Sequence, residues 1–177
     1  MDEVWFTPTP DIRWDKTTHL KSEVRIEILR TLVETHPQLK LCDLEVKSGP
    51  YRGAYVFLKE LKETFKEYQF YLLLGADTYH GIEQWRDPRI ENGLNGLKLL
   101  QEIPLILFAR EGVDFPIEED HLQKGGLLWE CFKIPKGLIG GRSSTKVRAV
   151  LQGDFCKQEK EILLGELVPK EIIPILL

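Results

Sequence analysis

Two short stretches of the chain combine residue types that could hold a nucleotide. In the first, an apolar run over residues 70–74 ends in Gly-Ala-Asp at 75–77, and Trp85 follows eight residues after Asp77. Such a run is typical of a parallel strand covered on both faces, and ligands of open α/β sheets lie just beyond the carboxyl ends of strands. Gly75 would let a ligand approach the backbone, Asp77 offers a carboxylate for ribose hydroxyls, and Trp85 offers a flat stacking face. The alternative is a capped turn followed by a core tryptophan.

The second stretch lies near the C-terminus, where a glycine pair at 140–141 precedes hydroxyl residues and a basic helix. The first turn of a helix presents unpaired amides, and the helix dipole there favours anions. Arg148 follows Ser144 and Thr145 by about one helical turn, so its guanidinium can lie beside the same anion. The stretch therefore predicts a phosphate cradle, with a capped surface helix as the alternative.

Composition narrows the classes of function. The chain has 177 residues, which fits one domain, and a formal net charge of -4, which argues against a nucleic-acid partner. Its three cysteines, Cys42, Cys131 and Cys156, form no C-x-x-C pair, so we expect small buried side chains in a reducing cytoplasm rather than disulfides or a zinc site. We find neither a signal peptide nor an apolar run of membrane-spanning length, and so expect a cytoplasmic protein without a membrane partner.

Apolar runs alternate with amphipathic stretches along the chain, which predicts an α/β protein with a doubly wound, mostly parallel sheet. We expect a single domain over residues 1–177, because no linker or repeat interrupts the pattern. The expected strands cover residues 1–6, 39–46, 70–74, 104–108 and 127–134. The expected helices lie within residues 22–37, 54–68, 88–100 and 143–151.

In this order the motifs resemble the nicotinate/nicotinamide mononucleotide adenylyltransferases. The match covers most of the chain, and the Ser-Ser-Thr-x-x-Arg motif is its most specific part. The segments that carry the resemblance are Ser22-Glu23-x-Arg25, Gly75-Ala76-Asp77 with Trp85, Arg110-x-Gly112, residues 143–148 and Leu167-Val168-Pro169.

The resemblance implies a Rossmann-like nucleotidyltransferase fold and a reaction in which the phosphate of the mononucleotide attacks the α-phosphorus of ATP, normally with Mg²⁺. It also implies roles for individual residues. The ATP phosphates would be held by Ser143, Ser144, Thr145 and Arg148. Gly75 and Asp77 would line the nucleotide site, Trp85 would stack on the pyridine ring, and Arg110 could face the mononucleotide. Lys16, in the loop after the first strand, resembles the family's basic loop residue.

The family's opening signature, Gly-x-Phe-Asp/Asn-Pro-x-His-x-Gly-His, is not in the sequence, where residues 1–6 resemble the family's second strand. None of His19, His36, His80 and His121 forms H-x-G-H, so none of the family's catalytic histidines is present. We therefore expect an N-terminally incomplete fold whose exposed edge would favour association between copies or domain swapping. Either the native protein has about thirty more residues, the usual size of a strand-loop-helix unit, or the product is truncated.

Three questions stay open at this stage. The preference for nicotinate or nicotinamide is open, because residues 49–54 replace the family's Pro-Ser-Tyr-Thr stretch. The chain could instead be a non-catalytic nucleotide-binding protein that keeps the pocket and lacks the histidines. It could also be a nucleotidyltransferase that acts on another phosphate, such as a pantetheine phosphate or a sugar phosphate.

Overall fold

The computed structural model describes residues 2–13, 17–85, 95–109, 128–133 and 142–177. The chain divides into two compact units, each with its own parallel sheet. Unit 1 comprises Met1–Tyr51 and Gly141–Leu177, and unit 2 comprises Arg52–Gly140.

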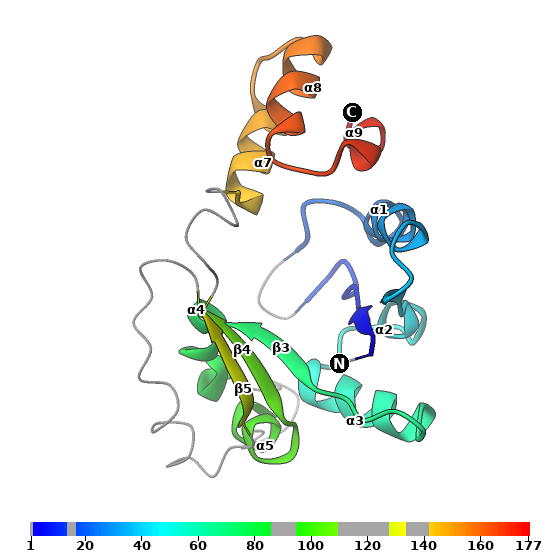
Figure 1. The fold of residues 1–177 in the computed structure, drawn as a ribbon, viewed down its shortest axis with the longest axis vertical. Coiled ribbons are helices and arrows are strands. Elements are labelled where there is room, and N and C mark those ends of the chain that lie inside the picture. The colour runs from blue at the N-terminus through cyan, green and yellow to red at the C-terminus, as the bar shows by residue number, and fades with distance from the viewer. Residues whose placement is uncertain (1, 14–16, 86–94, 110–127, 134–141) are drawn as a thin grey trace. The chain divides into compact units, whose positions relative to one another are not determined.

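The sheet of unit 2 has three parallel strands, visible side by side in Figure 1. Gly75 pairs with Phe108 at the carboxyl end of the first two strands, and the pairing of the second and third strands is irregular between Leu105 and Ile106. The parallel register brings the strand ends expected to hold a ligand to one edge of this sheet. The strands, in spatial order, are β3 (Leu72–Gly75), β4 (Leu105–Ala109) and β5 (Leu128–Lys133).

Buried apolar residues at helical spacing anchor the helices of unit 2 in its core. Phe57, Leu58 and Leu61 are buried in one of these helices, and Leu99 and Leu100 in another. The Tyr55 hydroxyl also donates a 2.8 Å hydrogen bond to Glu102 Oε2, which joins the same two helices. The helical elements of unit 2 are α3 (Ala54–Thr64), α4 (Ala76–Tyr79), the 3-10 turn η1 (Ile82–Gln84) and α5 (Asn95–Glu102).

Unit 1 combines a two-stranded parallel sheet with a small helical core. Val4 pairs with Leu39 at the start of that sheet. Val150, Leu164 and Ile173 form the buried cluster of its C-terminal helices. Its elements are β1 (Val4–Phe6), α1 (Ser22–Glu34), β2 (Leu39–Leu41), α2 (Leu44–Lys47), α7 (Ser144–Gln152), α8 (Lys157–Gly165), η2 (Lys170–Ile172) and α9 (Ile173–Leu176).

The predicted α/β class with parallel strands is confirmed, and one predicted strand is wrong in its second half. Residues 39–46 were expected to be extended throughout, but the chain turns into α2 after Leu41 and Cys42. A short apolar stretch is ambiguous between strand and helix. Here an ion pair of 3.0 Å between Asp43 and Lys47 spans one helical turn and favours the helix.

The strand expected to be covered on both faces differs from that expectation too. Leu73 of β3 is 36% exposed, whereas Leu105 and Leu107 of β4 are fully buried. Among the described strands β3 pairs with β4 alone, while β4 has a partner on each side. The continuous apolar run therefore identified a strand correctly but overstated its burial.

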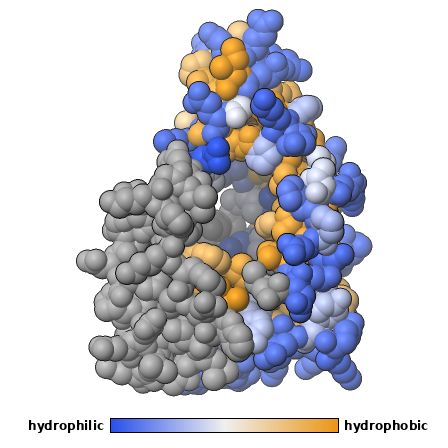
Figure 2. All heavy atoms as spheres, viewed as in Figure 1, coloured by the Kyte–Doolittle hydropathy of each residue, from blue (hydrophilic) through white to orange (hydrophobic). Residues whose placement is uncertain are grey.

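Hydrophilic residues predominate in the coloured part of the face that Figure 2 shows, and hydrophobic residues lie among them. Ile162 of α8 is the most exposed large apolar side chain of the C-terminal helices. No helix in the described ranges is both long and apolar enough to cross a membrane.

Candidate functional site

The carboxylate of Asp77 folds back over the backbone of Gly75. A β-carbon placed on Gly75 would lie only 2.4 Å from Asp77 Oδ1, so a side chain at this position would displace the Asp77 carboxylate from its present rotamer. The backbone of Gly75 is extended, with φ of -74°, a conformation that any residue adopts. Glycine at position 75 therefore allows the close approach of this carboxylate and does not serve an unusual turn.

Every third residue of the segment after β3 is buried, namely Ala76, Tyr79 and Ile82. One side of the short helix α4 and of the turn η1 therefore faces the interior of unit 2. Asp77 lies between these anchors and is exposed. No hydrogen bond or ion pair joins its carboxylate to another residue of the described ranges, so it can accept hydrogen bonds from a ligand.

Trp85 ends η1 and is fixed through its backbone on both sides. Its amide donates to the carbonyl of Ile82 at 3.0 Å, and its carbonyl accepts from the amide of Gly96 at 2.9 Å. The residue is half-buried. The indole can therefore rest on the core with one part and offer another part to a planar ligand.

Ser143 caps the amino end of α7. Its hydroxyl oxygen accepts a hydrogen bond of 3.2 Å from the Lys146 amide, and its extended backbone is that of an N-cap residue. Ser144 and Thr145, in the first turn, are exposed. Ser143, which the sequence predicts to bind phosphate, is thus a helix cap, and its hydroxyl proton is still available for donation. Ser144 and Thr145 face solvent.

Arg148 lies on the outer face of α7 beside Thr145. One guanidinium nitrogen, Nη2, donates to Thr145 Oγ1 at 3.1 Å. Val147 and Leu151, on the other side of the helix, pack against the buried cluster of unit 1 around Val150. The predicted neighbourhood of a hydroxyl and a guanidinium is therefore present, because residues three apart share one helix face.

The predicted site residues fall into two groups, one in each unit. Unit 2 brings Gly75, Asp77 and Trp85 onto the segment that follows β3. Unit 1 brings the residues of the second motif onto the first turns of α7. Lys16 and Arg110 lie outside the described residues.

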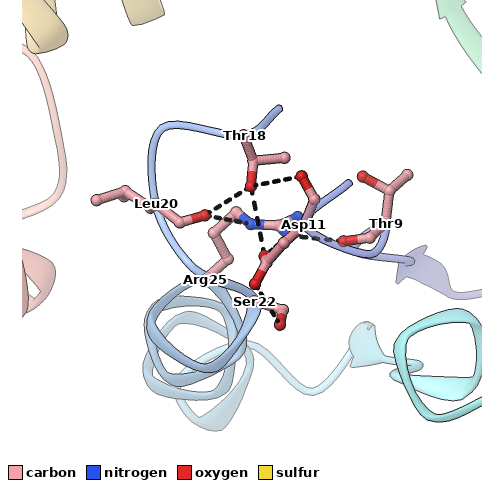
Figure 3. A network of polar contacts seen from close by, with 6 residues as sticks. All are labelled: Thr9, Asp11, Thr18, Leu20, Ser22 and Arg25. Atoms are coloured by element: carbon pink, nitrogen blue, oxygen red, sulfur yellow. Dashed lines mark hydrogen bonds and ion pairs between the residues drawn. The ribbon is translucent and has the colours of Figure 1, made fainter. Parts of the chain in front are cut away.

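Arg25 is the centre of a polar network in unit 1, shown in Figure 3. It belongs to α1, and its Nη2 donates to the Thr9 carbonyl at 2.6 Å and to Asp11 Oδ1 at 2.9 Å. Its Nε donates to the carbonyl of Leu20 at 3.1 Å. One side chain therefore ties both ends of the segment between β1 and α1 to the helix.

Two hydroxyl groups complete this network. Ser22 donates to Asp11 Oδ2 at 3.3 Å, and Thr18 donates to the Leu20 carbonyl at 2.9 Å. Partial burial tends to raise the pKa of Asp11, but hydrogen bonds from Arg25 and Ser22 and the charge of Arg25 outweigh it and lower that pKa. Sequence reasoning singled out Ser22 and Arg25 but missed Asp11, because no spacing rule pairs residues 14 apart across a loop.

The described histidines occupy the surface. His19, His36 and His80 are exposed, and His36 contacts only its neighbours in α1 through Nδ1. His121 lies outside the described residues. The sequence suggested that each is more often a surface or loop residue than a catalyst, and whether any of them takes part in catalysis stays a prediction.

The cysteines correct one expectation. Cys42 is buried, as expected, and burial raises the pKa of its thiol. Cys156 is exposed instead, because it begins α8, where its amide donates to Glu159 Oε2 at 2.8 Å. The side chain of Cys131 is not described. Across the described ranges no group of three His, Cys, Asp or Glu side chains could hold a metal ion.

Curated relatives match a large part of the chain. A protein of Oceanobacillus iheyensis is 30% identical over 114 residues, which are 63% of this chain and 54% of the relative. Relatives from Bacteroides thetaiotaomicron and Aquifex aeolicus are 25% and 26% identical over 69% and 66% of this chain. Each carries the name "Probable nicotinate-nucleotide adenylyltransferase". The matched segment spans about half the length of the first of these relatives, and no family model matches the chain.

Solved structures share the fold. The Plasmodium falciparum nicotinic acid mononucleotide adenylyltransferase complexed with NaAD superposes with a TM-score of 0.73, covering 99% of this chain and 80% of that one, at 24% identity. The same enzyme complexed with APC gives a TM-score of 0.63 at 26% identity, over 90% of this chain and 75% of that one. The likeness extends over both units.

Proposed function

We propose that this chain is a nicotinate-nucleotide adenylyltransferase, which transfers the adenylyl group of ATP to nicotinate mononucleotide in NAD biosynthesis, as its similarity to curated relatives of that name and to a solved structure supports. In this reaction a phosphate oxygen of the mononucleotide attacks the α-phosphorus of ATP. A new phosphorus–oxygen bond forms as the bond to the bridging oxygen breaks, so the products are the dinucleotide and pyrophosphate. A protein assists such a transfer mainly by positioning the two phosphates and stabilising their charge.

The observation that carries this proposal is the contact between Arg148 and Thr145 on the first turns of α7. The 3.1 Å hydrogen bond holds a permanently charged guanidinium beside an exposed hydroxyl, at the positive end of a capped helix. Phosphate oxygens of ATP could replace Thr145 as the acceptor of that donor. Ser143 and Ser144 would add hydroxyl donors at the same helix end.

The segment after β3 would receive the nucleosides. Asp77 has an exposed carboxylate suited to ribose hydroxyls, and Gly75 leaves room for that carboxylate to lie close to the backbone. Trp85 would stack on the pyridine ring through its accessible part. Lys16 and Arg110 complete the proposal as basic contacts for the mononucleotide phosphate, on the strength of the sequence motifs.

Mg²⁺ would accompany ATP in this scheme. Hard oxygen ligands of the substrate's own phosphates suit Mg²⁺, which offsets their negative charge. A cytoplasmic location and association between copies belong to the same proposal. The free Cys42 and Cys156 favour the first, and β3, which pairs with β4 alone among the described strands, favours the second.

The test is a reaction of the purified full chain with ATP, Mg²⁺ and nicotinate mononucleotide. We expect release of pyrophosphate and formation of the dinucleotide in equal amounts, measured by a coupled pyrophosphate assay and by chromatography. Nicotinamide mononucleotide and 4′-phosphopantetheine serve as rival acceptors. Binding of both substrates without pyrophosphate release would instead identify a non-catalytic nucleotide-binding protein, and turnover only with another acceptor would overturn the pyridine assignment.

Two variants test the ATP part and the mononucleotide part of the proposed site separately. Arg148→Ala is expected to raise the KM for ATP by about tenfold or more, because a charge-assisted hydrogen bond to phosphate is lost. Trp85→Ala is expected to raise the KM for the mononucleotide instead. Arg30→Ala, which removes an exposed arginine of α1, is the matched control and should leave both values unchanged. An Arg148→Ala enzyme with an unaltered KM for ATP would contradict the phosphate assignment.

A further inference from the structure

The start of α5 lies against the backbone of η1 at a position that admits no side chain. A β-carbon placed on Gly96 would lie 1.7 Å from the carbonyl oxygen of Ile82, 2.8 Å from its carbonyl carbon and 3.3 Å from the Cα of Glu83. All three atoms belong to the main chain. No change of rotamer can therefore relieve the overlap, and only a shift of one backbone against the other can do so.

The same glycine holds the backbone of Trp85. The Gly96 amide donates a 2.9 Å hydrogen bond to the Trp85 carbonyl. Trp85 in turn is bonded through its own amide to Ile82, the residue that Gly96 touches. Gly96 thus contacts η1 at both ends, by close packing at Ile82 and by a hydrogen bond at Trp85.

Neither side of this contact can yield easily. Ile82 is fully buried, and so are Leu99 and Leu100, which anchor α5 one turn after Gly96. Because the helix α5 and the turn η1 are both fixed in a close-packed core, a side chain at position 96 would force both backbones to shift slightly. Trp85 is half-buried and stands at the end of η1, so it is the residue that such a displacement would move most freely.

We propose that Gly96 is a positioning residue for Trp85 and thereby sets the affinity of the site for the planar ring of the mononucleotide. The inference rests on the proposed function, which assigns the indole of Trp85 to that ring. Gly96 itself does not touch the ligand in this scheme. Its contribution is the absence of a side chain, which lets α5 approach η1 closely enough to fix the indole.

The experiment compares Gly96→Ala with two matched glycine variants in the full chain. Gly165→Ala introduces the same methyl group where nothing lies within 4 Å, and Gly81→Ala introduces it next to η1 at 3.9 Å from the Thr78 carbonyl oxygen. We expect Gly96→Ala to raise the KM for nicotinate mononucleotide by about tenfold or more, since a displacement of about 1 Å has effects of that order. Its KM for ATP and both control variants should stay as in the unmodified chain.

A readout without substrate separates this inference from the proposed function. The chain is labelled with 5-fluorotryptophan, and the ¹⁹F resonance of Trp85 is assigned from its loss in Trp85→Phe. Gly96→Ala should shift that resonance, while Gly165→Ala should not. An unmodified chain that neither binds nor converts nicotinate mononucleotide would refute the proposed function, whereas the ¹⁹F comparison still reports whether Gly96 positions Trp85.

Two results would overturn the inference itself. One is an unshifted Trp85 resonance in folded Gly96→Ala. The other is an equal rise of both KM values, which would indicate general damage. If Gly96→Ala does not fold, hydrogen exchange of the Gly96 amide in the unmodified chain decides: mononucleotide binding should slow it and ATP binding should not, and the same exchange rate with and without mononucleotide would refute the proposal.

Discussion

Asp11 and Arg25 illustrate how single side chains tie a loop to a helix. The carboxylate of Asp11 accepts from Arg25 and Ser22, so it stays ionised more readily than an ordinary aspartate. Arg25 also donates hydrogen bonds to the carbonyls of Thr9 and Leu20, which lie near the two ends of the same loop. The pair therefore ties the backbone at Thr9 and at Leu20 to α1, which a surface ion pair by itself rarely does.

The lowered pKa of Asp11 predicts a pH-dependent stability. A carboxyl group whose pKa is lower in the folded state stabilises the fold fully above its ordinary value of 3.8, and that contribution is lost as the pH falls through the folded value. Asp11→Asn should therefore lower the Tm at pH 7 and lower it less at pH 3. Thermal unfolding by circular dichroism measures this, and Asp154→Asn, at an exposed position, is the control. An equal loss of Tm at both pH values would refute the ionic role of Asp11.

Among the secondary elements, α7 best shows how one sequence serves stability and binding together. Its inner face packs Val147 and Leu151 against the cluster around Leu164, while its outer face carries Thr145 and Arg148. The cap at Ser143 fixes where the helix starts, and thus which amides point outward. The proposed phosphate site therefore depends on the register of this helix.

Loss of the cap should weaken α7 measurably. Ser143→Ala removes the acceptor for the Lys146 amide, and such losses reduce the free energy of unfolding by about 1 kcal/mol. Urea denaturation followed by circular dichroism gives this quantity. Ser144→Ala, which takes away a hydroxyl with no described partner, should cost less. Equal losses in the two variants would show that the cap contributes nothing specific.

Over the whole molecule, two cores support the two groups of site residues. Leu164 belongs to the cluster of unit 1, and Leu99 and Leu107 belong to the interior of unit 2. Each core is built from segments of its own unit. A defect in one core is thus expected to be felt first within that unit.

Leu164→Ala tests this independence. The cavity should reduce the free energy of unfolding of unit 1 by about 2–5 kcal/mol, because Leu164 is fully buried. Hydrogen exchange followed by mass spectrometry should show faster exchange in α7 and α8, with little change in β4. Leu99→Ala is the reciprocal variant and should accelerate exchange in α5 and β4 instead. Uniform acceleration in either variant would mean that the two units unfold as one.

The α/β class, the capped basic helix and the strand ending in Gly75 were predictable from the sequence, because apolar periodicity and capping chemistry are local properties. The sequence also predicted that Arg148 would lie near Thr145, since residues three apart share a helix face. The half-exposed state of β3 and the turn into α2 did not follow from it.

Only the tertiary structure decided which distant residues meet. It paired Asp11 with Arg25, and it brought Gly96 against Ile82 and Trp85. The role of Gly96 depends on a contact with Ile82, which lies 14 residues away in the sequence. Contacts of this kind depend on how closely two backbones pack, and no pattern of residue types along one segment encodes that distance.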